Sequence, residues 1–168
     1  MVIIIKKFHL ILMILVVFLI AACSDKEVQH FSSKEEAFDF FIEKEDIEGN
    51  IDLILTKNEE DLLVVQFSED IYFVAELIED KEGYYVERIS DNVVLGIGAA
   101  WELNTADKNK YTIYFNEDKN DSIRTSLASS YMPLSNGEYE MSLVEGHTIT
   151  NDATEFTNAI KEVEVIKN

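Results

Sequence analysis

The sequence predicts an α+β fold that is mainly antiparallel β, with one N-terminal helix followed by a meander of about eight or nine strands, arranged as a sandwich or a curled sheet. Three observations lead to this prediction. A helix-capping pattern opens a segment with helical spacing near residue 33, and apolar residues then recur at every second position. The connections between these later segments are too short for the crossovers that parallel strands require.

The helix is expected from Lys34 to Asp46. Ser33 occupies the N-cap position and Glu36 the third helical position, which is the capping-box arrangement. Apolar residues follow at spacings of three and four, and they form one wide face that we expect to pack against a sheet: Ala37, Phe38, Phe41 and Ile42.

Alternating apolar residues predict the strands. Four strands with short polar turns are expected in the first half of the chain: 50–57, 62–67, 71–78 and 84–89. Residues 93–100 form either a strand or a buried turn, and further strands are expected at 101–104, 110–116, 123–127 and 138–144. Residues 152–166 are compatible with a capped helix, but Val163 and Val165 alternate with glutamates, which favours a closing strand over 160–166.

The first 22 residues have the pattern of an export signal. Lys6 and Lys7 precede an apolar run over residues 8–22, which as a helix would span roughly 22 Å, short of the ~30 Å hydrocarbon core of a bilayer. That length favours a signal peptide over a permanent span. The run ends in Ala21, Ala22 and Cys23, so that two small residues precede the only cysteine of the chain.

The segment Ile20-Ala21-Ala22-Cys23 resembles the lipobox of bacterial lipoproteins. The resemblance implies that a diacylglyceryl group is attached to Cys23 and that a signal peptidase cuts between Ala22 and Cys23. A secreted protein cut after Ala22 and an uncleaved membrane anchor are the alternatives. With its lipobox and its helix-then-meander order, the chain resembles small uncharacterised lipoproteins of Gram-positive bacteria. This likeness implies no activity.

This interpretation divides the chain into a signal peptide (1–22), a lipidated tether (23–32) and a single globular domain (33–168). Removal of the signal peptide leaves 33 acidic and 12 basic residues, a net charge of −21. Such a surface repels nucleic acid and anionic lipid, so we expect no nucleic-acid partner, and the lipid on Cys23 must hold the protein at the extracytoplasmic face of the cell membrane. The simplest role of the acidity is solubility.

Catalytic and metal-binding patterns are weak. His147 lies near Ser135 and Ser142 in sequence, but no nucleophile-elbow motif is present, and we interpret it as a turn histidine. Two acidic loops, 43–52 and 116–121, lack the ligand spacing of an EF-hand, and zinc ligands are too few. We therefore predict no catalytic residue, no metal and no cofactor.

Aromatic residues lie on both faces of the predicted strands. Most are expected in the core, whereas Tyr72 and Tyr85 are the first candidates for an exposed contact patch. The leading hypothesis is a binding or accessory module of the cell envelope, with an envelope protein as the partner. A carboxylate-dependent hydrolase of the envelope, or an inhibitor of a secreted or membrane protein that acts through a strand edge, are the alternatives. A buried acidic pair with raised pKa in a deep cleft would favour the hydrolase, and an apolar or aromatic patch without such a pair would favour binding.

Overall fold

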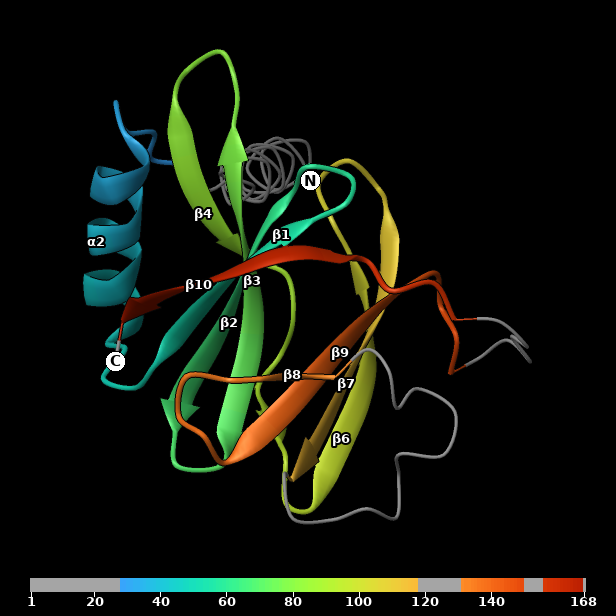
Figure 1. Cartoon of the computed structure of the whole chain (residues 1–168). Helices are drawn as coiled ribbons and strands as arrows, with labels where there is room; N and C mark the ends of the chain where they lie inside the picture. The colour runs from blue at the N-terminus through green and yellow to red at the C-terminus, as the bar shows by residue number, and fades with distance from the viewer. Residues whose placement is uncertain (1–27, 118–130, 150–155, 168) are drawn as a thin grey trace, which may run out of the picture.

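The computed structural model describes residues 28–117, 131–149 and 156–167. In this part of the chain, ten strands form two stacked antiparallel sheets, and one helix packs on the larger sheet (Figure 1). The predicted α+β class is confirmed. The larger sheet has the strand order β10-β1-β2-β3-β4, with β5 paired to β3, and the smaller sheet has the order β6-β7-β9-β8.

The larger sheet contains most of the first half of the chain together with the last strand. Its strands are β1 (Ile51–Thr56), β2 (Asp61–Ser68), β3 (Ile71–Glu79), β4 (Tyr84–Arg88), β5 (Val93–Val94) and β10 (Ile160–Lys167). The smaller sheet consists of β6 (Gly98–Asn104), β7 (Lys110–Glu117), β8 (Met132–Pro133) and β9 (Tyr139–Glu145).

The closing strand is confirmed, because β10 pairs antiparallel with β1 over Ile51 to Thr56. This pairing also corrects the expectation of a simple meander: the last strand returns across the molecule to the first (Figure 1). The ambiguous segment 93–100 contains both possibilities, since it forms β5, a turn at Gly96 and the beginning of β6. The predicted strand at 123–127 lies outside the described residues.

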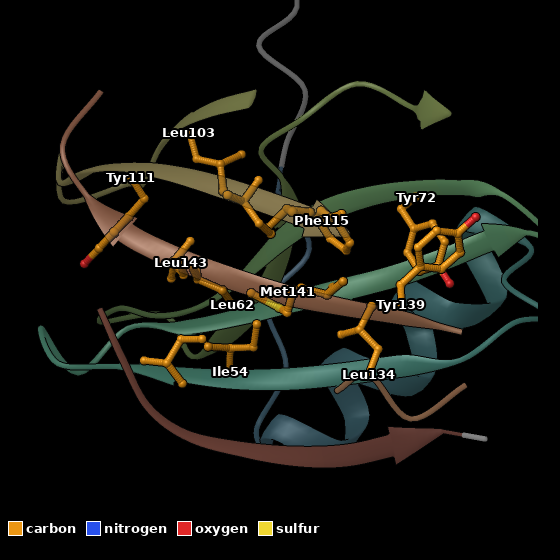
Figure 2. Close-up of a cluster of buried hydrophobic side chains, with 14 of the residues drawn as sticks. Ile54, Leu62, Tyr72, Leu103, Tyr111, Phe115, Leu134, Tyr139, Met141 and Leu143 are labelled. Atoms are coloured by element: carbon orange, nitrogen blue, oxygen red, sulfur yellow. The ribbon is translucent and has the colours of Figure 1, made fainter. Parts of the chain in front are cut away.

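The larger sheet is buried on both faces in its middle. Apolar side chains of both sheets meet between the layers, and Figure 2 shows Ile54 and Leu62 of the larger sheet with Phe115, Met141 and Leu143 of the smaller one. A second cluster lies on the other face of the larger sheet, under the helix: Phe41, Ile47, Ile51, Leu63, Val65, Phe73 and Ala75. Successive residues of the central strands therefore point alternately into two hydrophobic cores, one on each face of the larger sheet.

The helix α2 (Lys34–Glu45) begins with the expected cap, because the Glu36 backbone N–H donates to Ser33 Oγ (3.2 Å). The Glu36 side chain reaches one residue further back than a capping box requires and accepts from the backbone N–H and the hydroxyl of Ser32. Asp46 ends the helix in a left-handed conformation (φ 54°) and its N–H donates to carbonyls of the last turn.

Residues 30 and 31, which the sequence prediction places in the tether, contact the folded domain. Phe31 and Tyr84 exchange two backbone hydrogen bonds, of 2.8 and 2.9 Å, which adds residue 31 to the edge of β4. Phe31 also packs on Phe40 of α2 (4.9 Å between ring centres), and His30 bonds to Asp80 (3.0 Å). The fold therefore starts before the helix, because the edge of β4 offers backbone partners that the polar sequence does not reveal.

Candidate binding groove and buried acidic cluster

A groove of about 740 Å³ lies between α2 and the strands β1 and β10. It exists because one helix, about 10 Å wide, covers only about two strands spaced by 4.8 Å. The contacts of α2 with β4 are more extensive than those with any other strand, and the groove lies on the β1–β10 side of the helix.

Half-buried apolar side chains line this groove. Leu53 and Leu55 of β1 and Ile166 of β10 form its floor, and Phe38 and Ile42, four residues apart on α2, form its wall. Five apolar side chains in contact with water are a costly arrangement on a monomer surface, and such concave patches are typical of binding sites.

The rim of the groove is charged. Lys34 Nζ donates to Asp61 Oδ2 (2.6 Å), and this hydrogen bond raises the pKa of Lys34. Lys167 Nζ donates to the carbonyl oxygen of Ile47 (2.5 Å). Both lysines of the rim are thus engaged with the protein itself.

Four further carboxylates complete the rim: Glu35, Asp39, Glu162 and Glu164. Glu162 lies directly across from Leu55 and Glu164 across from Leu53 in the register of β1 with β10. Neither of these two glutamates forms an ion pair with another described residue. The groove is therefore apolar in its centre and negative along its length.

A second, polar cavity of about 240 Å³ adjoins the same Lys34–Asp61 pair, and Glu60 and Glu76 line it. Both glutamates are buried, with exposed fractions of 6% and 4%. The sequence did not single them out among 33 acidic residues. The available signal was the position of Glu76 inside the apolar strand 71–78, where a solvated carboxylate is not expected.

Glu60 is a structural acceptor. One carboxylate oxygen accepts from Thr105 Oγ1 (2.6 Å) and Asn109 Nδ2 (2.9 Å), and the other accepts from Thr56 Oγ1 (3.1 Å) and the Tyr111 hydroxyl. Thr56 belongs to β1, whereas the other three donors lie on β7 and the turn that connects it to β6, so Glu60 links the two sheets. Burial and the hydrogen bond to Glu60 raise the pKa of Tyr111 to about 12.

Glu76 differs from Glu60 because, among the described residues, its carboxylate accepts a single hydrogen bond. The backbone N–H of Ala106 donates to Glu76 Oε2 (2.8 Å), but burial outweighs this bond and raises the pKa of Glu76 to about 7, with Glu60 adding to the increase. Glu76 could exchange a proton near neutral pH. Glu60 lies in the same cavity, and each of its two oxygens accepts two hydrogen bonds.

The candidate contact patch of Tyr72 and Tyr85 is corrected in part. Tyr72 is 2% exposed and packs between the sheets against Phe115 and Tyr139, so it belongs to the core. Its ring fills the sandwich while Asn136 bonds its hydroxyl, which the alternation of the strand cannot reveal. Tyr85 is partly exposed and contacts the ring of His30 (5.0 Å) rather than Tyr72.

The other residues considered from the sequence lie apart from the groove. His147 Nε2 lies 3.0 Å from the carbonyl oxygen of Leu103, and its Nδ1 lies 3.5 Å from Glu102, whereas Ser135 bonds to the buried Asp52 through its hydroxyl (3.0 Å) and its N–H. Burial raises the pKa of Asp52 against these two bonds.

The lipidation and cleavage residues, Cys23 and Ala22, lie outside the described residues, as does the part of the second acidic loop from residue 118 onward. Within the described ranges, no three His, Cys, Asp or Glu side chains are arranged to hold a metal ion. No helix in the same ranges is long and apolar enough to cross a membrane.

No protein-family model, curated protein sequence or solved structure matches this chain.

Proposed function

We propose that this chain is a lipoprotein of the cell membrane that acts on the extracytoplasmic face as a binding or accessory module, with the groove between α2 and β1–β10 as its binding site. The observation that carries the proposal is the groove itself, in which five half-buried apolar side chains line a cavity of about 740 Å³. Cavities of roughly 300–1,000 Å³ with apolar linings are typical of ligand sites.

The sequence of the amino terminus supports the anchoring part of the proposal. A basic start, an apolar run and the segment Ile20 to Cys23 together form a lipobox-like signal. Two acyl chains, at about 0.8 kcal/mol for each buried CH₂, would hold the protein stably at the membrane, whereas its net charge would repel an anionic lipid surface.

The anchor is tested by changing its attachment atom. Cys23→Ser should abolish incorporation of radiolabelled palmitate and release the protein from the membrane fraction or leave it with an intact signal peptide. Ser24→Ala keeps the cysteine and serves as the control, with labelling and retention expected to persist. Unchanged processing and membrane retention of Cys23→Ser would disprove lipidation.

Occupation of the groove is tested in native membranes. A photo-crosslinking amino acid at Leu55 should form an adduct with a bound molecule, whereas the same group at Glu69, in the exposed β2–β3 turn, should not. Absence of an adduct at position 55 under conditions in which the protein is correctly anchored would contradict a binding role for this groove.

A further inference from the structure

We propose that the groove binds a basic amphipathic helix of a partner protein, which lies beside α2 and completes the helical layer over the larger sheet. This inference rests on the proposed binding function and identifies the kind of ligand. Three features support it: the shape of the groove, the position of its apolar floor between acidic rims, and the binding of its two lysines to other groups of the protein.

The shape fits a helix. The groove lies between α2 and the strands β1 and β10, on the face of the larger sheet that α2 covers in part. Helices packed on a sheet lie side by side about 10 Å apart, so the open side of the sheet has room for one more. Phe38 and Ile42 face this groove from one side of α2, and a second helix would bury them together with Leu53 and Leu55.

The charge pattern specifies the sequence character of that helix. The apolar floor has Glu162 and Glu164 on its β10 side and Glu35 and Asp39 on its α2 side. A helix with one apolar stripe bordered on each side by Lys or Arg would place its apolar residues on the floor and its cations on both rims.

The lysines of the groove are not paired with Glu162 or Glu164. Its two lysines are already bound, Lys34 to Asp61 and Lys167 to the Ile47 carbonyl. A basic ligand would therefore add charge pairs without breaking existing ones, and the strong negative charge of the whole protein would accelerate its encounter.

Other occupants fit less well. A phospholipid would bring an anionic phosphate between two acidic rims, and a second copy of this chain would bring a net negative surface to a negative groove. An extended peptide added to the outer edge of β10 would lie beside the sheet and leave the floor above β1 uncovered.

The test uses the full lipid-anchored protein in neutral detergent and three synthetic 18-residue peptides. The first has a leucine stripe bordered by lysines, the second has glutamate in place of each lysine, and the third has the composition of the first in an order without a stripe. We expect binding of the first peptide only, measured by fluorescence anisotropy at physiological salt.

Two charge-matched double variants locate the binding. Glu162→Gln with Glu164→Gln should weaken binding of the first peptide roughly tenfold, because two rim charge pairs are lost. Glu69→Gln with Glu87→Gln removes two exposed carboxylates elsewhere and should leave the affinity unchanged. All four side chains are exposed, so neither double variant should impair folding.

Four results would overturn the inference. Equal weakening of binding by both double variants would mean that the peptide is attracted to any acidic surface of the protein. Equal binding of the first and third peptides would mean that binding does not require an apolar stripe along a helix. Failure of all peptides together with a crosslink at position 55 to lipid or to a second copy would retain the binding site but reject this partner. Failure of the peptides without any crosslink would reject the proposed function as well.

Discussion

Two buried glutamates show how strongly the surroundings of a side chain decide its chemistry. Glu60 accepts four hydrogen bonds and links the sheets, whereas Glu76 receives one backbone donor in an equally buried position. Because burial penalises the charged form and only donors offset it, the pKa of Glu76 rises to about 7.

The raised pKa of Glu76 predicts a pH-dependent loss of stability. The folded state holds this proton more tightly than the unfolded state, whose value lies near 4.5, so the free energy of unfolding falls as pH increases from about 4.5 to about 7. Glu76→Gln removes the ionisable group and keeps a carbonyl oxygen for the Ala106 N–H. It should therefore be more stable than the parent by about 2 kcal/mol at pH 8 and equally stable at pH 4.5.

Urea unfolding at the two pH values measures this difference. Glu69→Gln, which changes an exposed carboxylate, is the control and should track the parent at both. A difference in stability between Glu76→Gln and the parent that is the same at pH 4.5 and at pH 8 would show that folding does not raise the pKa of Glu76.

At the scale of elements, the amino-terminal segment is part of the fold although its sequence is polar. Phe31 pairs with Tyr84 through two backbone hydrogen bonds, and Gly83 allows the two segments to lie close together. Gly83 has φ +132°, and a Cβ at this position would lie 2.3 Å from the Phe31 carbonyl oxygen. Glycine is thus required both for the backbone conformation and for the contact.

Gly83→Ala should detach the segment around Phe31 from β4 while the rest of the sheet remains folded. The amides of Phe31 and Tyr84 should exchange with solvent at least about tenfold faster, and the free energy of unfolding should fall by about 1–2 kcal/mol. Hydrogen exchange followed by NMR resolves both amides.

Gly137→Ala is the matched control for this experiment. Gly137 also has positive φ (+70°), but a Cβ there meets nothing within 4 Å. Its substitution should strain the β8–β9 turn and leave the exchange of Phe31 unchanged. Unchanged protection of Phe31 in Gly83→Ala would contradict the role of this glycine.

At the scale of the whole molecule, the pairing of Phe31 limits how far the domain can move from an anchor at Cys23. Seven residues separate the two positions, so Phe31 lies at most about 29 Å from Cys23 and about 15 Å away in a coil estimate. Phe31 is held against Tyr84 next to the β3–β4 hairpin, and β3 extends about 27 Å from this hairpin to the β2–β3 turn.

The proposed lipid anchor and this pairing together predict an orientation on the membrane. In vesicles carrying the lipidated protein, a fluorophore at Lys81 in the hairpin should be quenched more strongly by spin-labelled headgroups than one at Glu69 in the β2–β3 turn. The same labelled chains with Cys23→Ser should show no quenching at either position. Stronger quenching at 69 than at 81 would contradict the orientation.

The local features of this protein follow from its amino-acid sequence alone. The cap at Ser33, the alternation in β1 to β3 and the alternation of Val163 and Val165 with glutamates are set by neighbouring residues, because side-chain period follows directly from backbone geometry. These features were sufficient to predict an α+β fold with a closing strand.

What covers each face of a strand or helix depends on how the elements pack together. Alternation indicates which residues share a face, but it contains no information on whether a sheet, a helix or solvent lies above that face. For this reason Tyr72 is in the core, Glu76 is buried beside Ala106, and Leu53 and Leu55 line an open groove instead of a closed interface. The groove exists because the helix is narrower than the sheet, a relation between elements that no single segment of the sequence records.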